Sequence, residues 1–380
     1  MSSKKICLHY TSNFLPLTMV WIYTLLEHFQ NYDPFVLTRK KSNEKFFPYG
    51  KIKSLSDLFI IEQYLNIGFS KLTGVIPFFS KAASEIKPDI LHVHLGNIAY
   101  KLLPLKRKLG IPGLLSFYGA DAYLYPTQKK NRKKLLSVFR DMDKILVLGP
   151  AMQHELKQLG CPEQKTEILH LGIDTDKIAF TEKVFPLNRP LKFLLASSFV
   201  EKKGIDITLT ALERIRQAID FSIEIIGDGP LRSGIIEIVR KTGLQDKVIF
   251  HGYKPYAFVL DKAHECDVFL QASRTASNND KEGTPMVLVD VMAAGMPVIS
   301  TRHSDIPEIV VDNYTGYLAE ENDTESFAAC LIKLIDNADH FNDLSHHCRS
   351  HVDEQFNVFR QVEKLESLYN TLQLNYGIRS

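Results

Sequence analysis

Short apolar runs alternate along this chain with longer segments in which apolar residues recur every three or four positions. Runs such as Pro88–His94, Lys144–Leu148 and Ser222–Ile226 are rich in Ile, Leu and Val, as strands buried on both faces are. Strands that alternate with helices predict an α/β protein with parallel sheets. The predicted strands are 5–9, 35–38, 88–94, 114–117, 144–148, 192–196, 222–226, 248–250, 268–271 and 298–300. The predicted helices are 21–29, most of 57–86, 103–109, 133–140, 152–159, 205–218, 231–241, 256–264, 285–294 and 324–337.

This alternating pattern occurs twice, which predicts two Rossmann-like domains. Residues 176–190 contain two prolines and have no clear period, so we interpret them as the linker between a domain of residues 1–175 and a domain of residues 191–355. Residues 40–56 are basic and poorly periodic, and they are predicted to be irregular. A last amphipathic helix is predicted at about 356–378.

The composition is typical of a soluble globular protein, with 380 residues, 45% hydrophobic and 24% charged. No apolar run reaches the roughly 18 residues that a transmembrane helix needs, and no signal peptide is predicted. The five cysteines are scattered without a CxxC pair, which favours reduced thiols over disulfides or zinc. We therefore expect a cytoplasmic protein.

Charge is distributed unevenly between the two halves. Residues 1–180 contain 25 Lys and Arg against 15 Asp and Glu, whereas residues 181–380 contain 21 against 29. The basic clusters 106–108 and 129–134 are each explained most simply as a solvated face. Together with the asymmetry, they suggest an anionic partner, such as the inner face of the cell membrane. Nucleic acid is the rival partner, but no zinc finger or RNA-binding signature supports it, and we expect none.

The clearest candidate chemistry lies in residues 281–300. Thr284 is a favourable N-cap, Pro285 suits the first helical position, and Gly295 suits the end of the helix. The helix is almost entirely apolar, so Asp290 within it needs a partner. A salt bridge or a bond to the backbone is one interpretation. The other is that the helix N-terminus faces an anionic ligand, with hydroxyl groups bound by Asp290 and by Glu282.

Glu282 and Asp290, separated by seven residues and followed by Ala-Ala-Gly-Met-Pro, resemble the signature of retaining glycosyltransferases with the GT-B fold, glycosyltransferase family 4. The polar loop 273–281 resembles that of members which assemble exopolysaccharides such as colanic acid. The resemblance implies that Glu282 contacts the donor sugar and acts in catalysis. It implies that Asp290, where the family usually has Glu, contacts the nucleotide ribose. It also assigns the donor site the residues Gly283, Thr284, Pro285, Met286 and Val287.

Further residues of the second half continue this resemblance. Residues 197–204 are similar to the family segment Gly-Arg-x-x-x-x-Lys-Gly, whose Arg and Lys hold the donor diphosphate. Lys203 matches that Lys, and Ser198 stands where the Arg is expected. Arg274 is a candidate to replace the missing cation, and Arg232 is a second. The edge formed by Gly252 and Tyr253 resembles the part of the family that binds the nucleobase.

A glycine-rich segment, 227–232, follows a predicted strand and precedes a predicted helix, so a dinucleotide site must be considered. Its third glycine position is Arg232, and no acid that could hold a ribose ends the next strand. We therefore favour a tight turn between strand and helix.

In the first half, residues 116–121 resemble the family segment His-Gly-x-Asp near the reacting centre. Tyr118 replaces the histidine and Asp121 matches, so both join Glu282 as candidate catalytic residues. His92 and His94 share one face of a strand and could ligate a metal. No Cys or acid supplies a convincing third ligand, so we favour histidines of the core or its rim and expect no metal.

The resemblance implies a GT-B fold, with two Rossmann-like domains facing across a cleft and the last helix returning to the first domain. It implies retaining transfer of a hexose from a nucleotide-diphosphate sugar to a polysaccharide or lipid-linked oligosaccharide, without metal or cofactor. The chain would be cytoplasmic and peripheral on the membrane. Two alternatives stay open: a nucleotide-sugar epimerase of the same fold, and a non-catalytic nucleotide-sugar-binding protein.

Overall fold

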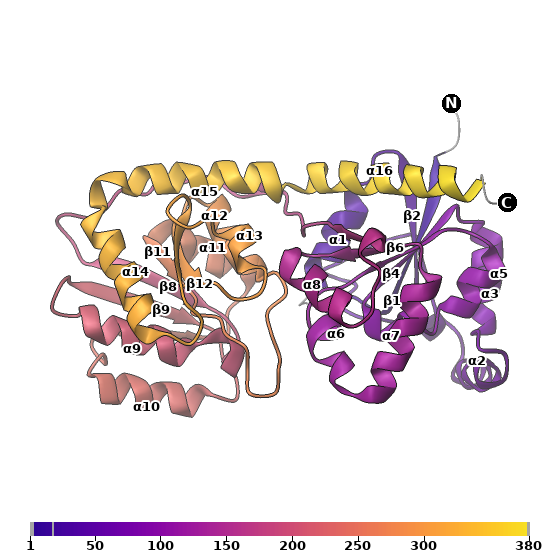
Figure 1. Ribbon diagram of the computed structural model, residues 1–380, viewed down its shortest axis with the longest axis horizontal. Helices are drawn as coiled ribbons and strands as arrows, with labels where there is room; N and C mark the ends of the chain where they lie inside the picture. The colour runs from indigo at the N-terminus through magenta and orange to yellow at the C-terminus, as the bar shows by residue number, and fades with distance from the viewer. Residues whose placement is uncertain (1–3, 17–18, 378–380) are drawn as a thin grey trace. The chain divides into compact units, whose positions relative to one another are not determined.

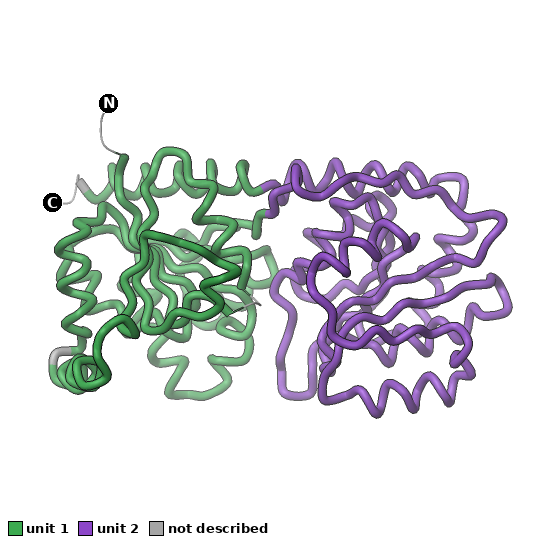
Figure 2. Tube along the Cα trace, turned by 180° about the vertical axis from the view of Figure 1, so that it is seen from behind, with its two compact units in different colours: residues 1–172, 358–380 green, residues 173–357 purple. Residues whose placement is uncertain are grey.

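The computed structural model describes residues 4–16 and 19–377. They form two compact units, one made of the described residues up to 172 together with 358–377, and one made of residues 173–357 (Figure 2). The chain therefore enters the second unit after Gly172 and leaves it after Asn357.

Unit 1 is built on parallel strands with helices between them (Figure 1). Its strands are β1 (Lys5–Phe14), β2 (Tyr32–Lys41), β3 (Ile52–Ser54), β4 (Ile90–His94), β5 (Gly113–Ser116), β6 (Lys144–Val147) and β7 (Thr166–Ile168). Its α-helices are α1 (Val20–Glu27), α2 (Ile60–Thr73), α3 (Pro77–Ile86), α4 (Gly96–Ala99), α5 (Leu103–Leu109), α6 (Ala120–Tyr123), α7 (Lys129–Asp141), α8 (Pro150–Gln158) and α16 (Val358–Gly377).

The sheet of unit 1 has the strand order β3-β2-β1-β4-β5-β6-β7. Buried side chains of the sheet pack on one face against α1 and α16, with Tyr369 of α16 fully buried among them. On the other face, Tyr10 of β1 packs against Phe79 of α3. The order of strands reverses between β1 and β4, the place where open α/β sheets bind ligands at their carboxyl ends.

Unit 2 repeats this architecture. Its strands are β8 (Leu191–Ala196), β9 (Phe221–Ile226), β10 (Val248–Gly252), β11 (Val268–Leu270), β12 (Val298–Thr301) and β13 (Gly316–Ala319). Its α-helices are α9 (Ile205–Ile215), α10 (Arg232–Thr242), α11 (Tyr256–Glu265), α12 (Met286–Ala293), α13 (Ile306–Ile309), α14 (Thr324–Asp336) and α15 (Phe341–Gln355).

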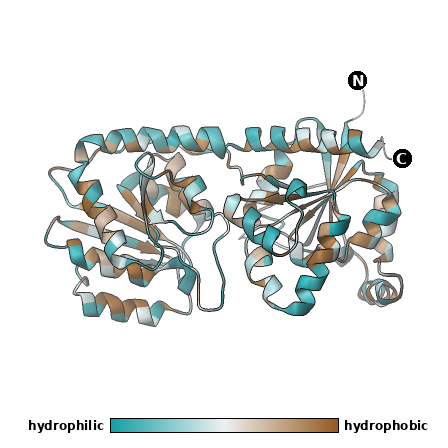
Figure 3. Cartoon of the chain, viewed as in Figure 1, coloured by the Kyte–Doolittle hydropathy of each residue, from teal (hydrophilic) through white to brown (hydrophobic). Residues whose placement is uncertain are grey.

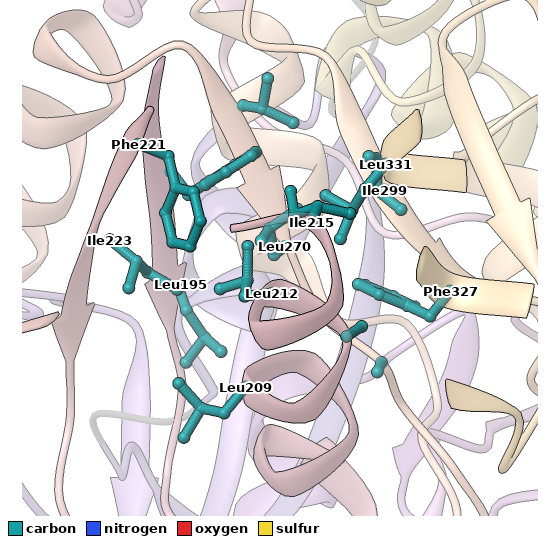
Figure 4. Close-up of a cluster of buried hydrophobic side chains, with 14 of the residues drawn as sticks. Leu195, Leu209, Leu212, Ile215, Phe221, Ile223, Leu270, Ile299, Phe327 and Leu331 are labelled. Carbon is teal, nitrogen blue, oxygen red and sulfur yellow. The ribbon is translucent and has the colours of Figure 1, made fainter. Parts of the chain in front are cut away.

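The sheet of unit 2 has the order β10-β9-β8-β11-β12-β13, and every pairing is parallel. Successive residues along a strand point to opposite faces of the sheet, and each face packs into its own hydrophobic core. One core contains Leu195 and Leu270 with α9 and α14 side chains such as Leu212 and Phe327 (Figure 4). The other contains Leu194, apolar residues of α11 and α12, and Cys348 and Val352 of α15. The strands are accordingly mainly hydrophobic in Figure 3, and burial on both faces explains their unbroken apolar runs.

The segment 176–190 differs from its interpretation as a linker. It lies within unit 2, where the Thr181 amide donates to the Ala294 carbonyl and the Lys183 ammonium donates to the His264 carbonyl. Two prolines and the absence of a period gave no sign of these contacts, because they are made by individual polar groups.

Several smaller expectations also need correction. The stretch predicted as irregular contains β3, and β13 and α15 were not predicted. The N-cap of α12 is Pro285 instead of Thr284, so the helix begins one residue later than expected. The end of that helix is as predicted, because Gly295 adopts a φ of 92°. A side chain there would lie 2.5 Å from the Thr181 carbonyl oxygen.

Candidate active site

The predicted donor residues of unit 2 follow the carboxyl ends of parallel strands, and so gather at one edge of the sheet. Ser198 and Lys203 follow β8, and Arg274 and Glu282 follow β11. These two strands are neighbours at the point where the strand order reverses. The loops approach closely there because Gly204 has a φ of 57° and no side chain. A Cβ atom at this position would lie 1.8 Å from the Ala272 carbonyl oxygen.

Lys203 and Glu282 form a buried ion pair at this place. The Lys203 Nζ lies 2.8 Å from Glu282 Oε1, and the two side chains are 13% and 7% exposed. Burial opposes ionisation of the Glu282 carboxyl, but the charges of Lys203 and Lys202 outweigh it and lower its pKa. The site therefore holds an ionised acid beside a cation at neutral pH.

A histidine that the sequence analysis missed fixes the loop that carries Glu282. The Glu282 amide donates to His303 Nε2 at 3.1 Å, so His303 carries its proton on Nδ1 when neutral. That nitrogen lies 2.8 Å from Oε2 of Glu321, whose other oxygen, Oε1, accepts the Thr275 amide. His303 follows β12 and Glu321 follows β13. Because 298–300 was predicted as a strand, His303 could have been placed at the edge where the donor residues lie, and prediction of β13 would have added Glu321.

Asp290 in α12 is 7% exposed, and the hydroxyl of Tyr256 at the start of α11 is its hydrogen-bond partner. Burial raises the pKa of Asp290 to about 7, and the bond from Tyr256 acts against this rise. The partner that Asp290 requires is thus a neighbouring phenol. Neither of the two partners weighed from the sequence, a salt bridge or the backbone, is the one observed.

The other predicted donor residues lie as follows. Ser198 is exposed on the loop after β8. Arg274 is held by Asp206 at 3.0 Å and by the Glu201 carbonyl at 3.1 Å, and Arg232 pairs with Asp228. Both arginines therefore have acidic partners.

The segment 283–287 connects Glu282 to α12. Gly283 and Pro285 are buried, and Thr284, Met286 and Val287 are half-buried. Gly252 ends β10, and Tyr253 beyond it is 75% exposed.

The glycine-rich turn after β9 has the role favoured from its sequence. A side chain on Gly227 would lie 1.8 Å from the Ser197 carbonyl oxygen. The turn thus lets two strand ends approach closely.

Unit 1 places Tyr118 and Asp121 after β5, at the carboxyl edge of its own sheet. Asp121 is 2% exposed and accepts backbone amides from Gly96, Tyr118 and Gly119 at 2.7–3.0 Å. Burial raises its pKa, against the effect of these bonds. The Asp121 carboxyl group therefore fixes the conformation of the loop that carries Tyr118. The Tyr118 hydroxyl lies 2.6 Å from His94 Nδ1, and burial raises its pKa, so it is a neutral phenol.

A third histidine, which the sequence analysis did not find, joins His92 and His94. It is His9 of β1, which lies in register with His92 of β4. One ring nitrogen from each of His9, His92 and His94 lies within 4.8 Å of the others. These nitrogens could ligate a metal, but their other contacts describe a hydrogen-bonded network. His9 Nδ1 lies 2.9 Å from His94 Nε2, and the rings of His92 and His94 stack with centroids 4.4 Å apart.

The network continues through His92, whose two ring nitrogens contact Tyr369 Oη at 2.6 Å and Ser116 Oγ at 2.8 Å. Burial lowers the pKa of His94 to about 3 and lowers those of His9 and His92 well below the usual value. All three imidazoles are therefore neutral. A tyrosine of α16, distant in sequence, completes this cluster.

Comparison with known proteins places this chain in a family. Residues 20–177 match the family described as Glycosyltransferase Family 4, and residues 177–351 match glycosyl transferases group 1. The chain is 32% identical over 294 residues to the amylovoran biosynthesis glycosyltransferase AmsK of Erwinia amylovora. The matched region covers 74% of this chain and 72% of AmsK. This chain belongs to glycosyltransferase family 4. The prediction of a glycosyltransferase is thereby confirmed.

The glycosyltransferase is also 30% identical over 290 residues to the putative colanic acid biosynthesis glycosyltransferase WcaL of Salmonella typhimurium. The matched region covers 75% of this chain and 71% of WcaL. Its fold is similar to that of HepE from Anabaena, solved in complex with UDP, with a TM-score of 0.78 and 15% identity over 97% of this chain and all of HepE. The predicted GT-B fold is confirmed. None of the helices described in this glycosyltransferase has the length and hydrophobicity needed to span a membrane.

Proposed function

We propose that this glycosyltransferase transfers a hexose, with retention of anomeric configuration, from a nucleotide-diphosphate sugar to a polysaccharide or lipid-linked oligosaccharide. The buried Lys203–Glu282 pair at the reversal point of the unit 2 sheet carries the proposal. A cation and an acid held together there suit a diphosphate and a sugar hydroxyl. The names of AmsK and WcaL, which mention amylovoran and colanic acid, support a polysaccharide product. The UDP bound to HepE supports a nucleotide ligand.

In this proposal, Lys203 and the amides at the start of α12 neutralise the diphosphate as it leaves. Glu282 accepts a hydrogen bond from a hydroxyl group of the donor sugar. Asp290 accepts one from the ribose, in exchange for or beside its bond to Tyr256. Gly252 and Tyr253 border the base. These groups supply the positive charge that the leaving group needs, so we propose that neither a metal nor a further cofactor takes part.

The proposed reaction is an attack by the acceptor hydroxyl on the face from which the diphosphate departs. An oxygen–carbon bond to the acceptor forms as the bond to the phosphate oxygen breaks, and the acceptor proton passes to the departing phosphate. Tyr118 contributes a neutral hydrogen-bonding group to the acceptor side, and Asp121 positions its loop. A neutral phenol suits uncharged sugar hydroxyls, and the buried His94 behind it holds the Tyr118 hydroxyl in place.

The test is to incubate the protein with a panel of nucleotide sugars and to measure released nucleotide with and without an acceptor extract. Transfer predicts release that depends on the extract and continues after dialysis against a chelator. An epimerase would consume nucleotide sugar without needing acceptor, and a binding protein would bind nucleotide sugar without releasing nucleotide. Absence of acceptor-dependent release across the panel would contradict the proposal.

We further propose that the protein works in the cytoplasm, peripheral on the inner face of the cell membrane. The support is the excess of Lys and Arg in residues 1–180 and the basic helix α7, which carries five of them between Lys129 and Lys134. Anionic lipids attract such residues by about 1 kcal/mol each near the surface.

A further inference from the structure

Helix α2 of unit 1 presents its large apolar side chains to solvent. Phe59 at its N-cap and Ile61, Tyr64, Leu65 and Leu72 within it are 55–85% exposed. At 3.6 residues per turn, Ile61, Leu65 and Leu72 fall within about 40° of one another. Figures 1 and 2 show the helix at the margin of unit 1.

The polar side of α2 is turned toward the protein, which reverses the usual arrangement of a surface helix. The Asn66 side chain accepts the backbone amide of Phe78 at 2.7 Å. The Gln63 side chain donates to the Leu58 carbonyl at 2.8 Å. Asn66 thus ties this side of α2 to α3, and the apolar side is left for a different environment. An exposed apolar patch of this kind marks a binding surface.

A cavity of about 540 Å³ lies beside α2, on the Tyr10 face of the sheet. Its walls are partly apolar, with Ile67, Phe79 and Leu105 among them, and they include the cationic side chains Arg39, Lys71 and Lys101. Among residues 4–16 and 19–377, the buried Nε of Arg39 has no hydrogen-bond partner. A buried guanidinium N–H without a partner is costly, and an anion in the cavity would satisfy it.

Cations also surround this surface. Lys71 is exposed and lies seven residues after Tyr64, hence on the apolar side of α2 and next to the cavity. The Lys134 Nζ, from the basic helix α7, lies 4.3 Å from the ring centroid of Tyr100, which lines the cavity. The patch is thus apolar with a basic border.

We propose that α2 lies in an anionic lipid surface, with the cavity beside it taking up the phosphate of a lipid. This deepens the proposed function and rests on its lipid-linked acceptor. Lys71 favours lipid over a second copy of the chain, because an apolar interface between two copies would bury its charge, whereas in a membrane it reaches the phosphate layer. Apolar side chains flanked by cations are the pattern of helices that bind anionic interfaces.

The experiment is co-sedimentation of the full-length protein with vesicles of phosphatidylglycerol and phosphatidylcholine over a salt series. We expect the wild type to bind. The variant Ile61→Ser, Leu65→Ser, Leu72→Ser should bind at least ~100-fold more weakly, since each buried large apolar side chain contributes roughly a ten-fold factor or more. The matched control Val184→Ser, Leu187→Ser changes side chains that are 65% and 85% exposed in unit 2, and should bind as the wild type does.

A second variant, Arg39→Gln, tests the cavity. It should lower affinity for vesicles with phosphatidylglycerol about five-fold and leave the weaker binding to pure phosphatidylcholine unchanged. An equal loss on both vesicles would overturn the phosphate site. Protection against thermal unfolding by inorganic phosphate that depends on Arg39, without any vesicle binding, would identify a free-phosphate site and overturn the lipid proposal.

Other outcomes are equally decisive. Wild type that stays in the supernatant at low salt overturns the proposal. A wild-type dimer that the triple α2 substitution converts to monomer, without vesicle binding, assigns the surface to a second copy and overturns it too. Nucleotide release with a soluble acceptor separates this inference from the proposed function. An α2 variant that fails to bind vesicles but still releases nucleotide supports α2 as a membrane contact. A wild type that binds vesicles but transfers no sugar supports the lipid site and contradicts the transferase proposal.

Discussion

The two units place candidate residues at equivalent edges of similar parallel sheets, but the chemistry of the two edges differs. In unit 2 the edge is charged, with Lys203 paired to Glu282 and with His303 in contact with Glu321. In unit 1 the edge is neutral, with imidazole and phenol groups bonded to one another around His94 and Tyr118. The same architecture therefore carries charged side chains at one edge and neutral ones at the other.

Burial leaves an ionised group at one edge and a neutral group at the other, because the charged residues around the two groups differ. Glu282 stays ionised because two lysines outweigh burial and lower its pKa. In unit 1 burial lowers the pKa of His94 to about 3, and no cation or acid contributes to that shift. We infer that the charged edge serves the diphosphate and the neutral edge serves sugar hydroxyls. The following substitutions test that division.

The largest effect is expected for Glu282→Gln, which removes the charge and keeps the size. If the acid binds the sugar more strongly in the transition state, nucleotide release with acceptor should fall by ~10²–10³. The control is Glu320→Gln, because that acid is exposed beside Arg302 and should be replaceable without loss. Full turnover in the Glu282 variant would remove this residue from the reaction.

Tyr118→Phe should affect the neutral edge alone. It leaves the buried His94 Nδ1 without its partner, which costs about 1–3 kcal/mol of unfolding free energy measured by denaturant titration. Nucleotide affinity, measured by calorimetry, should not change. Tyr64→Phe removes an exposed hydroxyl from the same unit and should leave stability unchanged. A loss of nucleotide affinity in Tyr118→Phe would show that the two edges do not act separately.

Asp290→Asn should weaken binding of a nucleoside diphosphate about ten-fold with little change in kcat, because the ribose is remote from the reacting bond. It should also change the pH dependence of stability. The folded pKa of about 7 lies above the unfolded value, so the wild type loses stability as pH rises from ~4 to ~7. The variant should lack that loss in thermal unfolding scans. Equal affinity in both proteins would leave Asp290 a structural residue.

The smallest effect is expected for Ser198→Arg, which adds a cation on the exposed loop after β8. Arg274 and Arg232 have acidic partners, so an added arginine should tighten diphosphate binding a few-fold, measured by the same calorimetry. No gain in affinity would indicate that another group already occupies that place.

The sequence by itself determined the parallel α/β architecture and most of its elements. Strands buried on both faces require unbroken apolar runs, and helix ends require particular residues such as Gly295, so both can be predicted locally. The family signature around Glu282 was likewise contained in one continuous stretch. The same local reasoning found Lys203 and Asp121, although not what they contact.

Only the tertiary structure decided the partners of these residues. Tyr256 reaches Asp290 from another helix, His303 reaches the Glu282 amide from another strand, and His9 joins the other two histidines from across the sheet. The outward apolar face of α2 also could not be foreseen, because periodicity shows that a helix has two faces but not which one meets the protein. A hydrogen bond or a buried face depends on which segments fold together, and a local pattern carries no information about segments that are distant in the chain.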